Sequence, residues 1–186
     1  MRPRGVLWVL IGPGVVIAAP APSYAVDYLT PEQAQAEAFP DAQAFDSREV
    51  ALSPEQVQRI EKRLGEQLRR SKWTLRIARR GGAALGIVVI DDVIGKFEKI
   101  TYAVAIGNDE AIRNVEVLSY RESHGQEVRL PAWRRQFVGK TAASRLRVGD
   151  DIANISGATL SCNHVTTGVR QIAAVVQELR DAGEIQ

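Results

Sequence analysis

The segment best suited to chemistry is Ser156-Gly157-Ala158-Thr159-Leu160-Ser161, which combines small residues with hydroxyl groups. It stands at the start of residues 159 to about 180, whose apolar side chains recur at helical spacing and predict a long helix. The start of a helix presents free backbone N–H groups and the positive end of the helix dipole, which together favour a phosphate. The hydroxyl of Ser156 or Thr159 could therefore cap this helix, hold a phosphate or be esterified to one. Gly157 would permit an unusual turn or a close backbone approach.

Two segments further upstream carry residue types that suit the rim of a binding site. The first is Tyr120-Arg121-Glu122-Ser123-His124-Gly125, and the second is Trp133 with Gln136-Phe137-Val138-Gly139-Lys140. They are similar, respectively, to the Glu-Thr-Pro-Gly segment and the Phe-Xaa-Gly-Lys stretch of the FMN-binding domain family. The Ser-Gly-Ala-Thr sequence that ends at Thr159 resembles the flavinylation motif of the same family. The resemblance in order and spacing covers roughly residues 100–179.

The FMN-binding domain family includes flavin-carrying subunits of the sodium-pumping NADH:quinone oxidoreductase and of the Rnf electron-transport complexes. In this family a periplasmic flavin transferase uses FAD and magnesium to join FMN to the motif threonine through a phosphoester bond. The resemblance implies that Thr159 carries covalent FMN and that nine further residues contribute to the cofactor site. These are Ser156, Gly157, Ala158, Leu160, Ser161, Glu122, Ser123, His124 and Gly125. It assigns no catalytic residue and no metal ligand.

Two positions depart from the family pattern, and simpler roles stay open for several residues. Ala153 stands where an aspartate is common, and His124 stands where proline is usual. Thr159 could be a plain helix cap, and Glu122 with Ser123 could simply end a strand. Because a single small apolar cysteine at a helix start usually serves packing, we expect Cys162 to be buried.

The amino terminus predicts export. Met1-Arg2-Pro3-Arg4 is basic, residues 5–19 are mostly apolar, and small residues stand at Ser23 and Ala25. This is typical of a signal peptide, residues 1–25, cleaved after Ala25. The alternative is an uncleaved membrane anchor, although the apolar stretch is shorter than the roughly 20 residues that a spanning helix needs. We therefore expect a periplasmic protein, with membrane association left open.

Composition and charge exclude several classes of protein. The chain is 45% hydrophobic and 25% charged, as in an ordinary globular domain. Cys162 is the only cysteine, so no intrachain disulfide can form. Without Arg2 and Arg4, the 24 basic residues fall to 22 and balance the 22 acidic ones. A neutral mature chain argues against nucleic-acid binding.

The predicted elements place the motif on an α+β fold. Thr30-Pro31-Glu32 and Ser53-Pro54-Glu55 are typical helix starts, the first helix running to about Ala38, while residues 41–50 suggest a loop or short extended piece. Strands are expected from Trp73, over 85–90, 100–106 and 112–120, with a linker at 91–96. We expect an antiparallel meander sheet flanked by N-terminal helices and a long C-terminal helix. The predicted organisation is a helical segment over residues 26–70 and an FMN-binding domain over residues 71–186.

The resemblance implies an electron carrier for which FMN supplies the redox chemistry. The implied partners are a flavin transferase during maturation and a membrane oxidoreductase or a haem or quinone redox partner. One alternative is a flavin-dependent reductase of a small extracytoplasmic substrate, which would need a closed pocket over the ring. The other is a binding or sensory module that has lost the flavin. Whether the protein turns over a substrate of its own stays open.

Overall fold

The computed structural model describes residues 26–122 and 124–185; the predicted signal peptide and Ser123 lie outside the described residues. Its centre is one antiparallel sheet in the order β1-β6-β5-β4-β3-β2. The strands are β1 (Val26–Asp27), β2 (Ala44–Ala51), β3 (Lys72–Arg80), β4 (Ala83–Ile94), β5 (Lys99–Gly107) and β6 (Ile112–Tyr120). The helices are α1 (Pro31–Ala38), α2 (Pro54–Leu64), α3 (Pro131–Arg134) and α4 (Thr159–Asp181), with short 3₁₀ helices η1 (Gln126–Arg129) and η2 (Arg135–Phe137). This confirms the predicted α+β class and the meander β3 to β6.

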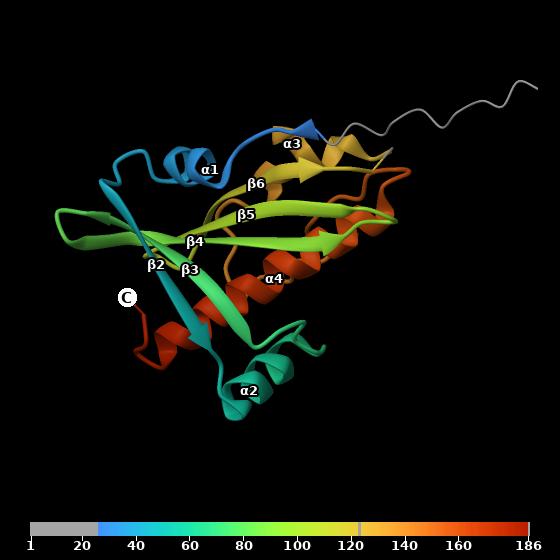
Figure 1. Cartoon of the computed structure of the whole chain (residues 1–186). Coiled ribbons are helices and arrows are strands. Elements are labelled where there is room, and N and C mark those ends of the chain that lie inside the picture. Colours follow the sequence, from blue (N-terminus) through green and yellow to red (C-terminus); the bar gives the residue numbers. More distant parts are fainter. Residues whose placement is uncertain (1–25, 123, 186) are drawn as a thin grey trace, which may run out of the picture.

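The helices cover the sheet on both faces (Figure 1). The long helix α4 crosses one face, where its apolar side packs with the inward residues of the strands and with α2 in the main core. On the other face, Ala34 and Phe39 at α1 pack with Val88, Ala103 and Leu118 in a smaller apolar cluster. Among the described residues, no helix has both the length and the apolar character needed to cross a membrane.

The helix starts at Thr30 and Ser53 are confirmed in detail. Each hydroxyl accepts a hydrogen bond from the backbone N–H of the glutamine three residues on. The side-chain oxygen of that glutamine in turn accepts a hydrogen bond from the backbone N–H of the cap residue. This reciprocal arrangement satisfies two N–H groups that a helix start otherwise leaves unpaired. It fixes where α1 and α2 begin, as the sequence predicts.

The sheet differs from the prediction at its edges and in the length of β4. The segment 41–50, expected as a loop or short extended piece, contains most of β2, which pairs with β3 along eight residues. Most side chains of β2 are exposed, so this edge strand lacks the apolar alternation that would reveal it. Residues 91–94, expected in a linker, continue β4 and pair with residues 99–102 of β5. The polar Asp91 suggests the end of a strand, but it is buried in a polar network. The division at residues 70 and 71 stays a prediction; both segments contribute strands to this one sheet.

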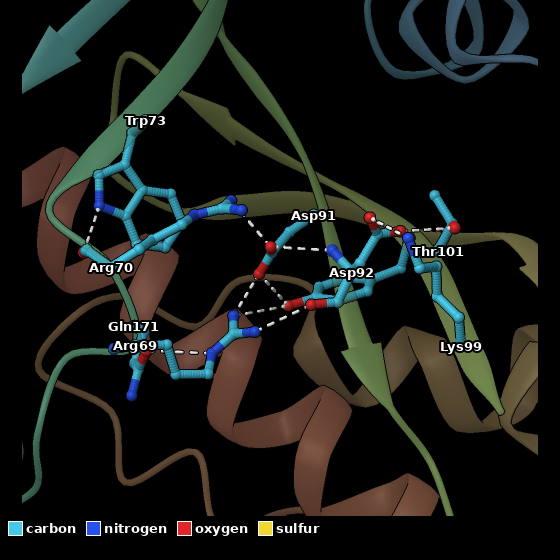
Figure 2. A network of polar contacts seen from close by, with 9 residues as sticks. Arg69, Arg70, Trp73, Asp91, Asp92, Lys99, Thr101 and Gln171 are labelled. Atoms are coloured by element: carbon cyan, nitrogen blue, oxygen red, sulfur yellow. Dashed lines mark hydrogen bonds and ion pairs between the residues drawn. The ribbon is translucent and has the colours of Figure 1, made fainter. Parts of the chain in front are cut away.

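The polar network around Asp91 ties the chain between α2 and β3 to the sheet (Figure 2). The Asp91 carboxylate is fully buried, pairs with Arg69, and lies 2.8 Å from Nη2 of Arg70. The Tyr102 hydroxyl donates to Asp91 Oδ2 at 2.8 Å, and Arg69 Nε donates to Gln171 Oε1 of α4 at 3.2 Å. Burial, and next the Asp91 charge, raise the pKa of Tyr102 well above its ordinary value, so the phenol stays a donor. The network thus joins β4, β5 and α4 to the segment between α2 and β3 that carries Arg69 and Arg70.

Candidate functional site

Helix α4 begins at Thr159, but among the described residues no hydroxyl caps it. The residue before its first turn is Ala158, and neither the Ser156 nor the Thr159 side chain makes a capping hydrogen bond. The alternative that Thr159 is a plain helix cap is therefore wrong. Gly157 adopts φ +82°, the left-handed turn that its small size permits.

The Thr159 hydroxyl is exposed at a helix start whose first backbone N–H groups find no acceptor in the described part of the chain. Thr159 is exposed, and its Oγ1 accepts a hydrogen bond from Asn154 Nδ2 at 3.1 Å. The first backbone N–H of the helix with an acceptor is that of Cys162, which donates to Ala158 O at 2.9 Å. Within the described residues, the N–H groups of Thr159, Leu160 and Ser161 have no acceptor. Together with the dipole they form a phosphate-binding arrangement next to the hydroxyl.

A cleft of about 410 Å³, here called the Thr159 cleft, lies beside this helix start. Its volume falls within the range of small-molecule sites. It brings together seven of the predicted site residues and two that the sequence analysis missed. The predicted ones are Gly157, Ala158, Thr159, Leu160, Ser161, Glu122 and His124, and the missed ones are Lys96 and Phe97.

The remaining predicted site residues lie apart from the cleft lining or outside the described residues. Ser156 is exposed and does not line the Thr159 cleft. Gly125 does not line it either, but packs closely against Ala158, where a side chain would collide. Its role is therefore to let the segment after β6 approach the helix start. Ser123 lies outside the described residues.

The turn between β4 and β5 forms the second wall of the Thr159 cleft. Glu122 is buried, and its Oε1 accepts hydrogen bonds from the backbone N–H groups of Phe97 at 2.6 Å and Glu98 at 3.0 Å. From α4, His164 Nδ1 lies 2.5 Å from Ile94 O. At Gly95 a Cβ atom would lie 2.5 Å from Glu122 Oε1, so only glycine lets the turn approach this closely. Glu122 thus does more than end a strand, since it holds this turn.

Phe97 and Leu160 give the Thr159 cleft an apolar surface. They are 74% and 45% exposed, a large apolar area for side chains that line a cleft. The Lys96 ammonium lies 4.9 Å from the centre of the Phe97 ring and adds a cation at the same wall. An aromatic, an aliphatic and a cationic group beside free helix N–H groups suit a flat apolar ring that carries a phosphate.

Tyr120 links the segment after β6 to α4. Its hydroxyl donates to His124 O at 2.5 Å and lies 3.3 Å from Ser161 Oγ. Burial raises the pKa of Tyr120, and the Ser161 hydrogen bond only partly opposes this effect. The phenol therefore stays protonated and holds the backbone of His124 close to the helix start.

The segment from Trp133 to Lys140 positions the loop that leads to Thr159. Trp133 Nε1 donates to Ala153 O at 2.8 Å, and Gln136 Oε1 accepts from Ala153 N at 2.8 Å. Lys140 Nζ lies 3.0 Å from Asp151 Oδ2 and does not line the Thr159 cleft. The side chains of this segment therefore hold the backbone at Ala153, just before the motif, and do not enter the cleft.

A larger cleft of about 830 Å³ lies between α2, the C-terminal half of α4 and residues 141–150. Several of its arginines already have acidic partners: Arg63 with Asp181 at 3.4 Å, and Arg145 with Asp150 at 3.5 Å. It contains none of the motif residues. The candidate site is therefore the smaller Thr159 cleft.

The match to a family model agrees with this placement. Residues 95–174 match the model of the FMN-binding domain, a range that begins at the Gly95 turn and ends within α4. Among solved structures, the chain is similar to NqrC of Shewanella oneidensis, with 16% identity, a TM-score of 0.48, and coverage of 77% of this chain and 87% of that chain. No curated protein matches. The resemblance to the FMN-binding domain family is thus confirmed over residues 95–174, a range that includes every residue lining the Thr159 cleft.

Proposed function

We propose that this protein is an exported flavoprotein that carries FMN on Thr159 and passes electrons between redox partners. The observation that carries the proposal is the exposed Thr159 hydroxyl beside the N–H groups of Thr159, Leu160 and Ser161, for which the described residues provide no acceptor. An anion at this position gains hydrogen bonds and a favourable helix dipole. The residues of the Thr159 cleft therefore fit the phosphate of FMN, and Phe97 with Leu160 fits the apolar ring.

Attachment would be a phosphoester at Thr159 Oγ1, made by a flavin transferase. The new bond joins this oxygen to the flavin-side phosphorus of FAD, while AMP leaves and the hydroxyl gives up its proton. Asn154 Nδ2 donates to Thr159 Oγ1, which leaves the hydroxyl proton directed away from the amide. Export, a periplasmic location and maturation after export rest on the predicted signal peptide, residues 1–25.

When bound, FMN would supply one- and two-electron transfer. The chain's own part is to hold the phosphate at the start of α4 and to keep the 95–98 turn in place through Glu122 and His164. The exposure of Phe97 and Leu160 favours a carrier over a reductase with a closed pocket, because the ring would meet a partner directly. The proposed partner is a membrane oxidoreductase or a haem or quinone redox partner.

Denaturing gel electrophoresis tests the attachment. Protein co-produced with a flavin transferase should show a fluorescent band that survives denaturation and is lost in Thr159→Ala. Ser156→Ala is the matched control and should keep the band, since Ser156 lies outside the Thr159 cleft. A band that persists in Thr159→Ala would contradict attachment at this residue.

Electron transfer is tested separately with dithionite-reduced holoprotein and oxidised cytochrome c as a general acceptor. A carrier should reduce cytochrome c at a rate that rises linearly with its concentration. Rapid, saturating reduction of a small organic substrate without such transfer would instead support the reductase alternative.

A further inference from the structure

Strand β6 carries a bulge at Leu118, close to its end. In the pairing with β5, Tyr102 stands opposite Val117 and Thr101 stands opposite Ser119, so Leu118 has no partner residue. A bulge changes the direction in which the neighbouring side chains point. Leu118 packs in the apolar cluster beneath α1, whereas Tyr120 packs in the main core beside α4.

A second cleft, here called the Ser119 cleft, opens at this bulge. It has a volume of about 370 Å³, and its apolar walls include Tyr28, Leu29 and Leu118. Its polar lining includes Ser119 and Arg121. It shares no residue with the Thr159 cleft, so the proposed flavin site does not account for it.

Ser119 lines this cleft, and the described residues provide no partner for its buried hydroxyl. Ser119 is 8% exposed, and its Oγ makes no hydrogen bond within the described part of the chain. Buried polar groups in native proteins are nearly always hydrogen-bonded, because an unmade bond costs free energy. An unsatisfied donor on a residue that lines a cleft is a group that an acceptor from a ligand can satisfy.

Arg121 supplies a cation to the same cleft. It is exposed and forms no ion pair with any residue that the structure describes. The first turn of α1 also lines the cleft, with Thr30 and Pro31 at the positive end of its dipole. A guanidinium pairs best with a carboxylate or phosphate. The small, largely apolar cleft favours the carboxylate.

We propose that the Ser119 cleft binds a small organic acid with an apolar body and one carboxylate. The body lies against Tyr28, Leu29 and Leu118, and the carboxylate accepts hydrogen bonds from Ser119 and Arg121. This site is additional to flavin binding and does not depend on it.

Titration of the ¹⁵N-labelled protein with octanoate tests the proposal. Amide shifts should saturate and be largest at residues 28–33 and 118–121, and octylamine should produce no comparable saturation. Arg121→Glu should weaken octanoate binding at least about tenfold, because it removes a charge-assisted hydrogen bond. The matched control Arg80→Glu has the same charge change at a 61% exposed arginine outside this cleft and should leave binding unchanged.

Ser119→Ala separates binding from folding. The variant should bind octanoate about twofold to tenfold more weakly, because one hydrogen bond is lost. It should melt at no lower temperature than the parent, because the hydroxyl that it removes is unpaired in the described structure. The proposal is overturned by non-saturating shifts, by equal binding of octylamine, by shifts centred elsewhere, or by unchanged affinity in Arg121→Glu or Ser119→Ala.

Discussion

Substitution of Glu122 should loosen the turn that forms the second wall of the Thr159 cleft. The Glu122 carboxylate accepts the backbone N–H groups of Phe97 at 2.6 Å and Glu98 at 3.0 Å. Glutamine keeps an oxygen acceptor in the same place but removes the charge. Alanine removes the acceptor, so both N–H groups must turn to water.

The structure sets the size of this effect. A hydrogen bond to a charged group contributes about 1.5–3 kcal/mol and a neutral one about 0.5–1.5 kcal/mol. Over two bonds, Glu122→Gln should lower the free energy of opening the turn by about 2 kcal/mol, or about thirtyfold in the opening equilibrium. Glu122→Ala should lower it by about 3 kcal/mol, or more than about a hundredfold, with water replacing part of the loss at this exposed turn.

Amide hydrogen exchange measures this opening directly. The N–H groups of Phe97 and Glu98 should exchange faster by these factors, while the N–H groups of the β5 core keep their rates. Glu98→Gln is the matched control, because Glu98 is exposed and lies outside the lining of the Thr159 cleft. Unchanged exchange at Phe97 and Glu98 in Glu122→Ala, or equal acceleration across the sheet, would refute the reasoning.

Contacts elsewhere in the structure lead to four further predictions. Asp91→Asn should lower the free energy of unfolding by about 2–4 kcal/mol in urea titrations, because the buried carboxylate pairs with Arg69 and Arg70. Tyr102→Phe should cost about 1 kcal/mol, and the double variant should cost less than the sum, since both act on one hydrogen bond; full additivity would contradict the network. Burial alone would raise the pKa of Asp151, but the N–H groups of Arg147 and Leu146 and the Lys140 ammonium outweigh it and hold that pKa below the ordinary 3.8. The carboxylate therefore contributes stability above pH 3.8. The difference in the free energy of unfolding between the parent and Asp151→Asn should shrink as the pH falls from 3.8 through the lowered pKa, and a difference that grew on acidification would contradict this. Burial raises the pKa of the Cys162 thiol, so iodoacetamide should modify the folded protein far more slowly than the urea-unfolded chain, and equal rates would show that the thiol is accessible.

The sequence predicts the parts of the fold that local signals control. The capping residues Thr30 and Ser53 fix the starts of α1 and α2, and apolar runs separated by turn residues locate β3 to β6. Helical periodicity and the small residues before it locate the start of α4. The sequence does not predict the edge strand β2, because its side chains are mostly exposed and show no apolar alternation. It does not predict β1 either, because this strand spans only two residues.

The candidate site is only partly predictable, since its second wall depends on contacts between distant segments. Glu122 reaches Phe97 across 25 residues of sequence, and His164 reaches Ile94 across 70. The short sequence Gly95-Lys96-Phe97-Glu98 looks like an ordinary linker, and nothing local indicates that Phe97 is exposed beside the motif. The lack of a hydroxyl cap on α4 likewise depends on backbone geometry at Ala158.

Peptide mass spectrometry of protein isolated from the periplasm, after co-production with a flavin transferase, tests the central claim most directly. We expect the peptide that contains Thr159 to gain the mass of one FMN less one water, with fragment ions that place the gain on Thr159. Thr159→Ala should abolish the gain, and Ser156→Ala should retain it. An unmodified Thr159 peptide, or a flavin located on another residue, would contradict the proposal that this hydroxyl carries the cofactor.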